Sequence, residues 1–247
     1  MGGSVVNRTV EVRPTADALA TDVAQALADR IAVAQQERGV AHVVLTGGGI
    51  GTAVMAALAP LPVDWSALHL WWGDERFLPD GDPDRNVTQA AAVLLDRVPL
   101  VPGHVHAMPA DTGQGVEQAA LDYADALARS SADGSLPRFD VLLLGVGPEG
   151  HVASIFPESP AAKTGDAIVA VHASPKPPPT RITMTFPTIR SADDVWLVAA
   201  GQEKAAAIAQ AMDPTTNPVD VPAAGAVGTR ACVAWIDSAA ASALRPT

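Results

Sequence analysis

The chain has 247 residues, of which 48% are hydrophobic and 17% are charged. This balance is typical of an ordered globular protein and excludes a disordered or solvating chain. The formal net charge of -11 argues against non-specific binding to nucleic acid or to an anionic membrane, because long-range repulsion opposes both. An anionic substrate therefore has to be bound by a local cluster of Arg and Lys.

The cysteine count and the N-terminal segment limit which cellular compartment and which kinds of metal or disulfide site we expect. Cys232 is the only cysteine, which excludes an intrachain disulfide and a cysteine-based metal site. It lies in the apolar run ACVAWI, which favours a buried strand position over a reactive thiol. The first residues contain no basic region followed by an apolar segment, and no window reaches the roughly 18 uninterrupted apolar residues of a membrane span. We therefore expect a cytoplasmic protein without a membrane partner.

The first half of the chain alternates predicted strands and helices. Residues 5–13 read as a strand, and a helical pattern then opens at Pro14 and Thr15 and stops at Gly39. The apolar positions of this helix recur every four residues: Leu19, Val23, Leu27 and Ile31. Buried strands are predicted at 41–46 and 68–72, with a glycine-rich turn and a short helix (52–59) between them. Strand, glycine turn and helix in that order open a parallel α/β unit.

The second half continues the alternation. Helices are predicted at 86–95, over the amphipathic stretch marked by Val116, Ala120, Tyr123 and Leu127, and at 201–212. Strands are predicted at 139–145, 167–171, 181–186, 195–200 and 231–236. The proline-rich segments 174–180 and 213–222 read as loops, since strand patterns resume after each. We expect one α/β domain over residues 1–247, doubly wound, with a mostly parallel central sheet and helices on both faces.

A glycine-rich segment, TGGGIGT at 46–52, follows the second predicted strand. It can cradle a phosphate, because glycines let backbone N–H groups approach an anion at the start of a helix, or it can be only a tight turn. The third glycine of a G-x-G-x-x-G motif would fall on Thr52, and no G-K-S/T follows. These absences exclude a dinucleotide fingerprint and a nucleotide P-loop.

Charged and titratable residues follow two further strands. Asp74, Glu75 and Arg76 come directly after the strand at 68–72, where parallel strands build ligand sites, although such residues often form only a solvated turn. The segment 145–157, GVGPEGHVASIFP, places three glycines around His151. A lone histidine is more often structural than catalytic, but a glycine-rich loop at a strand end favours a functional role.

Two cations stand at the start of later elements. Arg181 begins a strand, and Lys204 falls in the first turn of the helix 201–212. A lysine there opposes the helix dipole, which is tolerable when an anion lies between them; the alternative is an exposed side chain.

Taken together, TGGGIGTAV, WGDERFLPDGDPDRNVTQA, LLLGVGPEGHVASIFP, RITMTFPTI and GQEKA resemble the 6-phosphogluconolactonase family in order and spacing, from about residue 40 to 236. The most specific match is the family pattern G-x-G-P-D/E-G-H-x-A-S-L/I-F-P, followed by the GDER block with its downstream Asn86. Two departures stand out. The family's usual S-G-G-S-T-P loop is replaced at Gly49, Ile50 and Gly51, and Glu149 stands where aspartate is commoner.

The resemblance implies hydrolysis of 6-phospho-D-glucono-1,5-lactone, the ring-opening step of the oxidative pentose phosphate pathway, with no metal or redox cofactor. It also implies that His151 is the general base, a role that suits an imidazole with an ordinary pKa near 6.5. Asp74 is predicted either to orient that imidazole or to position the lactone hydroxyls, and Arg76 to contact the carbonyl or the phosphate. The predicted substrate- and phosphate-binding residues are Thr46, Gly47, Gly48, Gly49, Asn86, Arg181 and Lys204.

Two other functions stay open. A glucosamine-6-phosphate deaminase would share the fold and a G-x-G-x-D-G-H loop, but Arg76 and the S-I-F-P segment resemble the lactonases instead. A non-catalytic sugar-phosphate sensor would need a DNA-binding segment, and the roughly 40 residues before the glycine loop read as one strand and one helix, too little for a helix-turn-helix. The expected partner is a small sugar-phosphate lactone, and a monomer is slightly favoured.

Overall fold

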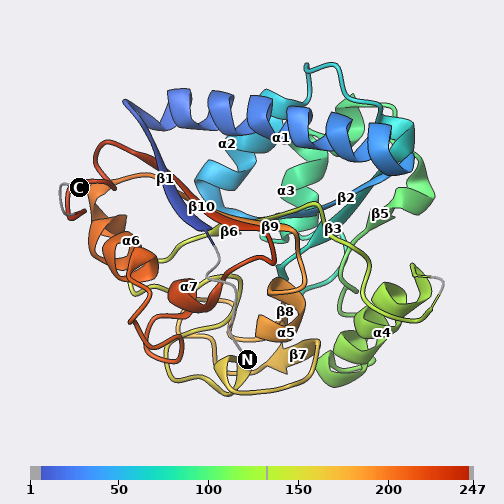
Figure 1. Ribbon diagram of the computed structural model, residues 1–247. Helices are drawn as coiled ribbons and strands as arrows, with labels where there is room; N and C mark the ends of the chain where they lie inside the picture. The colour runs from blue at the N-terminus through green and yellow to red at the C-terminus, as the bar shows by residue number, and fades with distance from the viewer. Residues whose placement is uncertain (1–6, 132, 245–247) are drawn as a thin grey trace.

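A seven-stranded sheet forms the centre of the computed structural model, which describes residues 7–131 and 133–244 (Figure 1). Its strand order is β1-β10-β9-β6-β2-β3-β5, and every pair of neighbours is parallel. The strands are β1 (Asn7–Arg13), β2 (Ala41–Leu45), β3 (Leu68–Trp72), β5 (Val105–His106), β6 (Val141–Gly145), β9 (Asp194–Ala199) and β10 (Ala231–Asp237). The mostly parallel central sheet that the sequence predicts is confirmed.

Helices lie on both faces of this sheet, with α1 to α3 on one side and α4 to α7 on the other (Figure 1). They are α1 (Ala16–Arg38), α2 (Gly48–Leu58), α3 (Asn86–Val93), α4 (Val116–Arg129), α5 (Phe186–Ile189), α6 (Ala205–Met212) and α7 (Pro222–Gly225). Single 3-10 turns lie at Trp65–Ala67, Leu95–Arg97, Pro102–His104, Pro160–Ala162 and Gln202–Lys204. None of the helices in the described part of the chain combines the length and apolar character needed to cross a bilayer.

The long helix α1 shows how local sequence sets an element. Thr15 caps its start, since the Oγ1 atom accepts a hydrogen bond from the Ala18 N–H at 3.2 Å. Gly39 ends it in the left-handed conformation, at φ 77°, and donates its N–H to the Gln35 carbonyl. The predicted apolar stripe is fully buried against the sheet and α2: Leu19, Val23, Leu27 and Ile31.

The strands in the middle of the sheet are buried on both sides, which explains their uninterrupted apolar runs. Trp71 and Trp72 of β3 have no exposed surface. Cys232 of β10 is also buried, and burial raises the pKa of its thiol to about 11. The predicted role of Cys232 as a buried strand residue is confirmed.

A second, three-stranded sheet differs from the sequence prediction. It consists of β4 (Asp74–Arg76), β8 (Arg181–Met184) and β7 (Ile168–Val171), and both pairings are antiparallel. The sequence predicts the strands 167–171 and 181–186 within one mostly parallel sheet and does not predict a separate antiparallel sheet. Parallel neighbours need a crossover of a dozen or more residues, usually a helix, and the loop 172–180 is too short for one.

Gly73 joins the two sheets, because it stands between the end of β3 and the start of β4. Its N–H donates to the Leu45 carbonyl of β2, and its carbonyl accepts from the Met184 N–H of β8. The residues of β4 therefore project from the carboxyl end of the parallel sheet into the smaller one.

Two helix boundaries differ from the prediction in ways that affect the site. Helix α2 begins at Gly48 rather than at 52, so the glycine segment forms its first turn. The predicted helix 201–212 divides into the 3-10 turn Gln202–Lys204 and α6, so Lys204 lies at the junction.

Candidate active site

A cleft of about 600 Å³ lies where the carboxyl ends of β2, β6 and β9 face the smaller sheet. Ligands bind at this edge in open α/β sheets. All of the residues predicted for the site line the cleft: Thr46, Gly47, Gly48, Gly49, Asp74, Arg76, Asn86, His151, Arg181 and Lys204. The structure thus brings together six separate segments of the chain. It adds Lys176, Glu203 and Asp17, which the sequence reading had not included.

His151 is held closely by its own loop, 145–157. The Gly147 N–H donates to the His151 carbonyl at 2.9 Å, and a Cβ atom at position 147 would lie 1.9 Å from Nδ1 of the imidazole. Glycine is therefore required at 147 for this close approach. The ring packs against Phe156, with 4.7 Å between the centroids, and its Nδ1 lies 2.9 Å from Oε1 of Glu149.

The surroundings of His151 favour a neutral imidazole. Burial lowers its pKa below the usual value, and the positive charge of Lys176 lowers it further, while Glu149 and Asp74 act in the opposite direction. A carboxylate at Nδ1 favours the tautomer with the proton on that nitrogen. Nε2 then carries the lone pair that can accept a proton.

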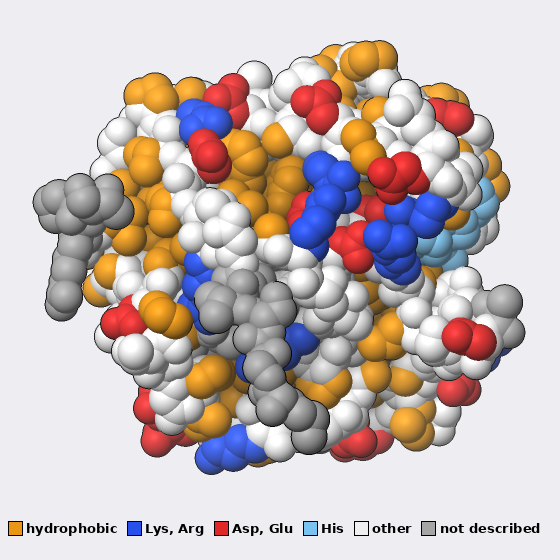
Figure 2. Space-filling view, in the orientation of Figure 1, with side chains coloured by type: hydrophobic (Ala, Val, Ile, Leu, Met, Phe, Trp, Pro, Cys, Tyr) orange, Lys and Arg blue, Asp and Glu red, His pale blue; other side chains and the backbone are white. Residues whose placement is uncertain are grey.

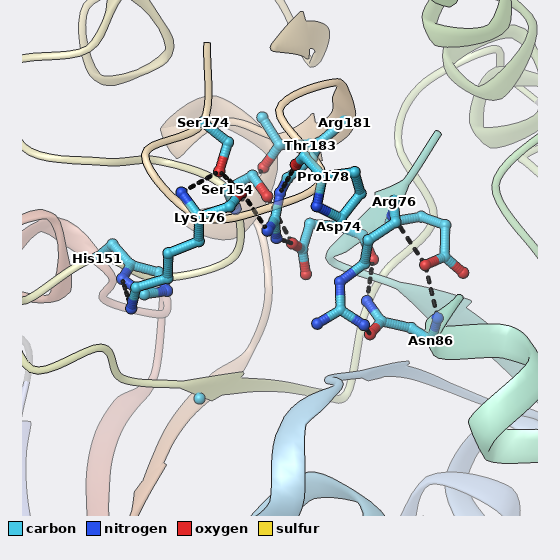
Figure 3. Close-up of polar contacts among 12 residues, drawn as sticks. Asp74, Arg76, Asn86, His151, Ser154, Ser174, Lys176, Pro178, Arg181 and Thr183 are labelled. Carbon is cyan, nitrogen blue, oxygen red and sulfur yellow. Dashed lines mark hydrogen bonds and ion pairs between the residues drawn. The ribbon is translucent and has the colours of Figure 1, made fainter. Parts of the chain in front are cut away.

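Asp74 stabilises the loop that carries His151. Its Oδ2 accepts a 2.6 Å hydrogen bond from the Ser154 hydroxyl, and the Ser154 N–H donates to Oγ1 of Thr183 on β8 (Figure 3). The sequence left open whether Asp74 orients the imidazole. In the structure Nδ1 is hydrogen-bonded to the Glu149 carboxylate, which accepts, and Asp74 is bonded to the loop instead.

Arg76 and Asn86 form one hydrogen-bonded unit. Nη1 of Arg76 donates to Oδ1 of Asn86 at 2.9 Å, and Nδ2 of Asn86 donates to the Asp74 carbonyl at 2.8 Å (Figure 3). A Cβ atom at Gly47 would lie 2.0 Å from the Asn86 amide oxygen, so the amide packs directly on the glycine turn. Asn86 therefore fixes the direction of the Arg76 guanidinium along the wall of the cleft.

Glu75 stands between Asp74 and Arg76 in the chain but does not face the cleft. Its carboxylate accepts hydrogen bonds from the N–H groups of Asn86 at 2.6 Å and Val87 at 2.9 Å. These are orphan donors in the first turn of α3, so Glu75 caps that helix from a distant strand. The side chain is fully buried and lies outside the cleft.

The glycine segment begins α2 and lines the cleft. Thr46 Oγ1 accepts from the Gly145 N–H at 3.1 Å, which ties the ends of β2 and β6 together. Gly47 is the N-cap of α2 and provides no side-chain cap, and Gly48 and Gly49 of the first turn line the cleft. The positive end of the helix dipole therefore faces the same space as Lys204, whose pKa is lowered by burial.

Arg181 is buried, and most of its donors are already used. Nε and Nη2 donate to three main-chain carbonyls of the loop 174–180 at 3.0 to 3.1 Å. Nη1 lies 3.8 Å from Oδ2 of Asp74. Arg181 also stands opposite Arg76 in the antiparallel register of β4 and β8. Only Nη1 therefore remains for the predicted contact with a phosphate. The other donors of Arg181 hold the loop 174–180 in place.

The chain matches known proteins over most of its length. A family model described as glucosamine-6-phosphate isomerases/6-phosphogluconolactonase matches residues 14–235. The chain belongs to this family. A 6-phosphogluconolactonase from Streptomyces coelicolor is 54% identical over 238 residues, which cover 92% of this chain and 90% of that protein. The resemblance that the sequence motifs indicated is confirmed.

Two solved structures show the fold that the family shares. The 6-phosphogluconolactonase from Thermotoga maritima has a TM-score of 0.84 and 24% identity, covering 94% of this chain and all of its own. A monomeric glucosamine-6-phosphate deaminase has a TM-score of 0.78 and 23% identity, covering 95% and 99%. Because proteins with both names share this fold, the reaction has to be argued from the residues in the cleft.

Among the cleft residues that sequence reasoning missed, Lys176 lies beside His151. Its Nζ lies 3.2 Å from Oε1 of Glu149 and 3.5 Å from Nδ1 of His151. The sequence reading treated the segment 174–180 only as a proline-rich loop. The available signal was a lysine in front of a run of three prolines, a segment with little freedom to move the side chain elsewhere.

Proposed function

We propose that this protein hydrolyses 6-phospho-D-glucono-1,5-lactone to 6-phospho-D-gluconate in the oxidative pentose phosphate pathway. The observation that carries the proposal is the imidazole of His151, bonded through Nδ1 to Glu149 in a cleft that also has cationic walls. The name of the Streptomyces coelicolor relative, which is 54% identical, supports the same reaction. Ester hydrolysis requires an activated water, a stabilised oxyanion and a proton for the leaving alkoxide.

His151 acts as the general base. Its Nε2 accepts a proton from water while the water oxygen bonds to the lactone carbonyl carbon, which gives a tetrahedral oxyanion. Collapse of this oxyanion breaks the bond from that carbon to the ring oxygen. The imidazolium then returns the proton to the ring oxygen, so that the lactone and one water become the open-chain acid. Glu149 stabilises the imidazolium during this cycle, as the orienting carboxylate of a triad does.

Arg76 stabilises the oxyanion. Asn86 and the main chain hold its guanidinium in one direction, and fixed donors stabilise a developing charge better than mobile ones. Asp74 keeps the His151 loop in place through Ser154. It also lines the cleft, where its carboxylate can accept a hydrogen bond from a lactone hydroxyl.

The phosphate binds at the first turn of α2, with Lys204 as its counter-charge. Backbone N–H groups at a helix start and a nearby ammonium suit a phosphate dianion. This local cluster explains how a protein with a net charge of -11 binds an anionic substrate. Binding energy from the phosphate, which does not react, positions the lactone for attack.

The test is hydrolysis of freshly generated 6-phosphogluconolactone, with spontaneous opening subtracted, by the wild type and by His151→Ala. We expect kcat/KM to fall at least about 100-fold in the variant, because general-base catalysis contributes about 10² to 10⁴ in rate. His172→Ala is the matched control, since His172 is 61% exposed and does not line the cleft. It should retain wild-type activity.

Other outcomes distinguish the alternatives. An inactive wild type that releases ammonia from glucosamine 6-phosphate would establish a deaminase. Binding of sugar phosphates without turnover of either compound would establish a sensor. An active His151→Ala variant would leave the reaction standing and assign the base to another group.

A further inference from the structure

We propose that Lys176 is a positioning residue that keeps His151 unprotonated and Glu149 in place, so that the base is ready at neutral and mildly acidic pH. The inference rests on the proposed lactonase reaction. It assigns a catalytic purpose to the proline-rich loop 174–180, which would otherwise be only a connection between β7 and β8.

The three groups form a compact triangle. Nδ1 of His151 lies 2.9 Å from Oε1 of Glu149, and Nζ of Lys176 lies 3.2 Å from the same oxygen and 3.5 Å from Nδ1. The ammonium and the imidazole thus share one carboxylate. An ammonium at this distance disfavours a second positive charge on the ring, whereas the carboxylate alone would favour it.

Lys176 is presented by a fixed backbone rather than by a mobile surface loop. Arg181 donates to the Lys176 carbonyl at 3.0 Å and to two neighbouring carbonyls. Ser174 completes the support, since its Oγ accepts from the Lys176 N–H at 3.2 Å and donates to the Lys176 carbonyl at 2.8 Å (Figure 3). Arg181 and Ser174 are both buried. A backbone held in this way reduces the ordering entropy that a long side chain loses when it makes a contact.

The balance of charge around His151 shows why a cation is needed there. Glu149 from the same loop and Asp74 from β4 both favour the imidazolium, while Lys176 opposes it. Lys204, across the cleft, interacts electrostatically with Glu149 and Lys176. Without Lys176, burial would be the main remaining factor that lowers the pKa of His151, against two carboxylates that raise it. A base that becomes protonated near neutral pH loses its function there.

The experiment compares Lys176→Met with Lys176→Arg over pH 5 to 9, using kcat/KM for the lactone and the NMR titration of the His151 imidazole. Lys176→Met should raise the pKa of His151 and move the acid limb of the activity profile to higher pH. A shift of about half a unit to one unit corresponds to about a threefold to tenfold loss below the pKa. Lys176→Arg, which keeps the charge, should largely restore the wild-type profile. Lys163→Met, which removes an exposed lysine, is the matched control.

Glu149→Gln should shift the pKa of His151 in the opposite direction. Removal of the carboxylate leaves Lys176 unopposed, so the pKa of His151 should fall. The two substitutions should therefore move the same titration in opposite directions, which a merely structural role does not predict. Should Lys176→Met fail to fold, Lys176→Gln takes its place.

Two results would overturn the inference. One is an unchanged His151 titration in Lys176→Met. The other is a KM increase that is equal at every pH, which would make Lys176 a ligand of the substrate. The NMR titration does not need turnover, so it still decides the inference if the wild type fails to hydrolyse the lactone, in which case the proposed function fails on its own.

Discussion

Charged side chains lie at both ends of the parallel sheet, but those at the amino end are paired with each other and those at the carboxyl end face the cleft. At the amino end, the fully buried carboxylate of Asp140 is bonded to Arg38 and to the His42 N–H, and Asp194 at the start of β9 is bonded to Arg230. Figure 2 shows Lys and Arg side chains beside Asp and Glu on one face of the molecule. At the carboxyl end, Lys204 and the first turn of α2 face the cleft. Removing one partner of a buried charge pair destabilises the protein, whereas charges that face a cleft can bind a ligand.

Histidines show the same contrast. His42, His69, His104 and His106 stack at the β2–β3–β5 side of the sheet, with ring centroids 3.9 to 5.1 Å apart along the stack. Figure 2 shows histidine side chains grouped at one edge. Burial first, and then repulsion between the rings, lowers the pKa to about 3 for His42 and about 4 for His69 and His106. His151 and the exposed His172 each have a carboxylate on the ring, and of these two only His151 lines the cleft. A lowered pKa alone does not identify a catalytic histidine.

The largest effect should come from Gly147→Ala. The new Cβ would lie 1.9 Å from Nδ1 of His151 and would displace the imidazole, and a misplacement of about 1 Å can reduce activity about 100-fold. The atoms it meets belong to the side chains of His151 and Glu149, so the melting temperature should change little. Activity and thermal melting measured on the same preparation check this. Normal kcat/KM would contradict the requirement for close approach.

Asp140→Ala should chiefly affect stability. It leaves the His42 N–H without its side-chain acceptor and Arg38 without its carboxylate. We expect a loss of about 2 to 3 kcal/mol, the range for an uncompensated buried polar group. Urea unfolding measures it, with kcat/KM expected to be unchanged. A strong loss of activity at full stability would mean that the two ends of the sheet are not separate in function.

Gly228→Ala is the amino-end counterpart of Gly147→Ala. Its Cβ would lie 2.5 Å from the Asp193 carbonyl oxygen and 2.7 Å from that of Ala231, which are main-chain atoms and cannot move aside easily. A loss of about 1 to 2 kcal/mol is expected from overpacking. Thermal melting should record a drop of several degrees, with turnover per folded molecule preserved. Unchanged melting would show that this end tolerates backbone shifts.

The smallest effect concerns acid stability. Three of the stacked histidines, His42, His69 and His106, have folded pKa values of about 3 to 4, below the unfolded value of about 6.5, so the unfolded state binds more protons between pH 4 and 6.5. Their contribution to stability is complete above pH 6.5 and is lost as the pH falls toward 4. His69→Phe keeps a ring and removes one titrating group. The drop in melting temperature between pH 7.5 and pH 5 should be smaller in this variant by a few degrees, and an equal drop would exclude the stack as its cause.

Sequence reasoning succeeded where local chemistry decides the structure. The caps at Thr15 and Gly39 bound α1 as expected, and the strand at 68–72 lies where its apolar run predicts. The motif residues all line one cleft because strand ends of a parallel sheet meet at one edge. The roles of His151 and its neighbours, and the single domain over 1–247, stay predictions.

The failures share one cause, which is contact between segments far apart in the chain. The antiparallel sheet depends on the pairing of β4 with β8, which no local period encodes. Lys176 meets Glu149 in a distant loop, and Arg181 and Ser174 hold the backbone that presents it. The sequence assigns no role to Glu75, which in the structure caps α3 from another element. Local patterns do not record such partners.

The register of β4 and β8 has a consequence for ligand-linked stability. Arg76 and Arg181 stand opposite each other on the two strands, and the Asp74 carboxylate lies 3.8 Å from Nη1 of Arg181. Directly opposed like charges destabilise an antiparallel pair. A dianion bound at the first turn of α2 would lie in the same cleft as both guanidinium groups, so it would reduce this repulsion and would also stabilise the folded state by mass action. The protein should therefore melt at a higher temperature in inorganic phosphate than in chloride at equal ionic strength, so that the substrate contributes to the fold that binds it.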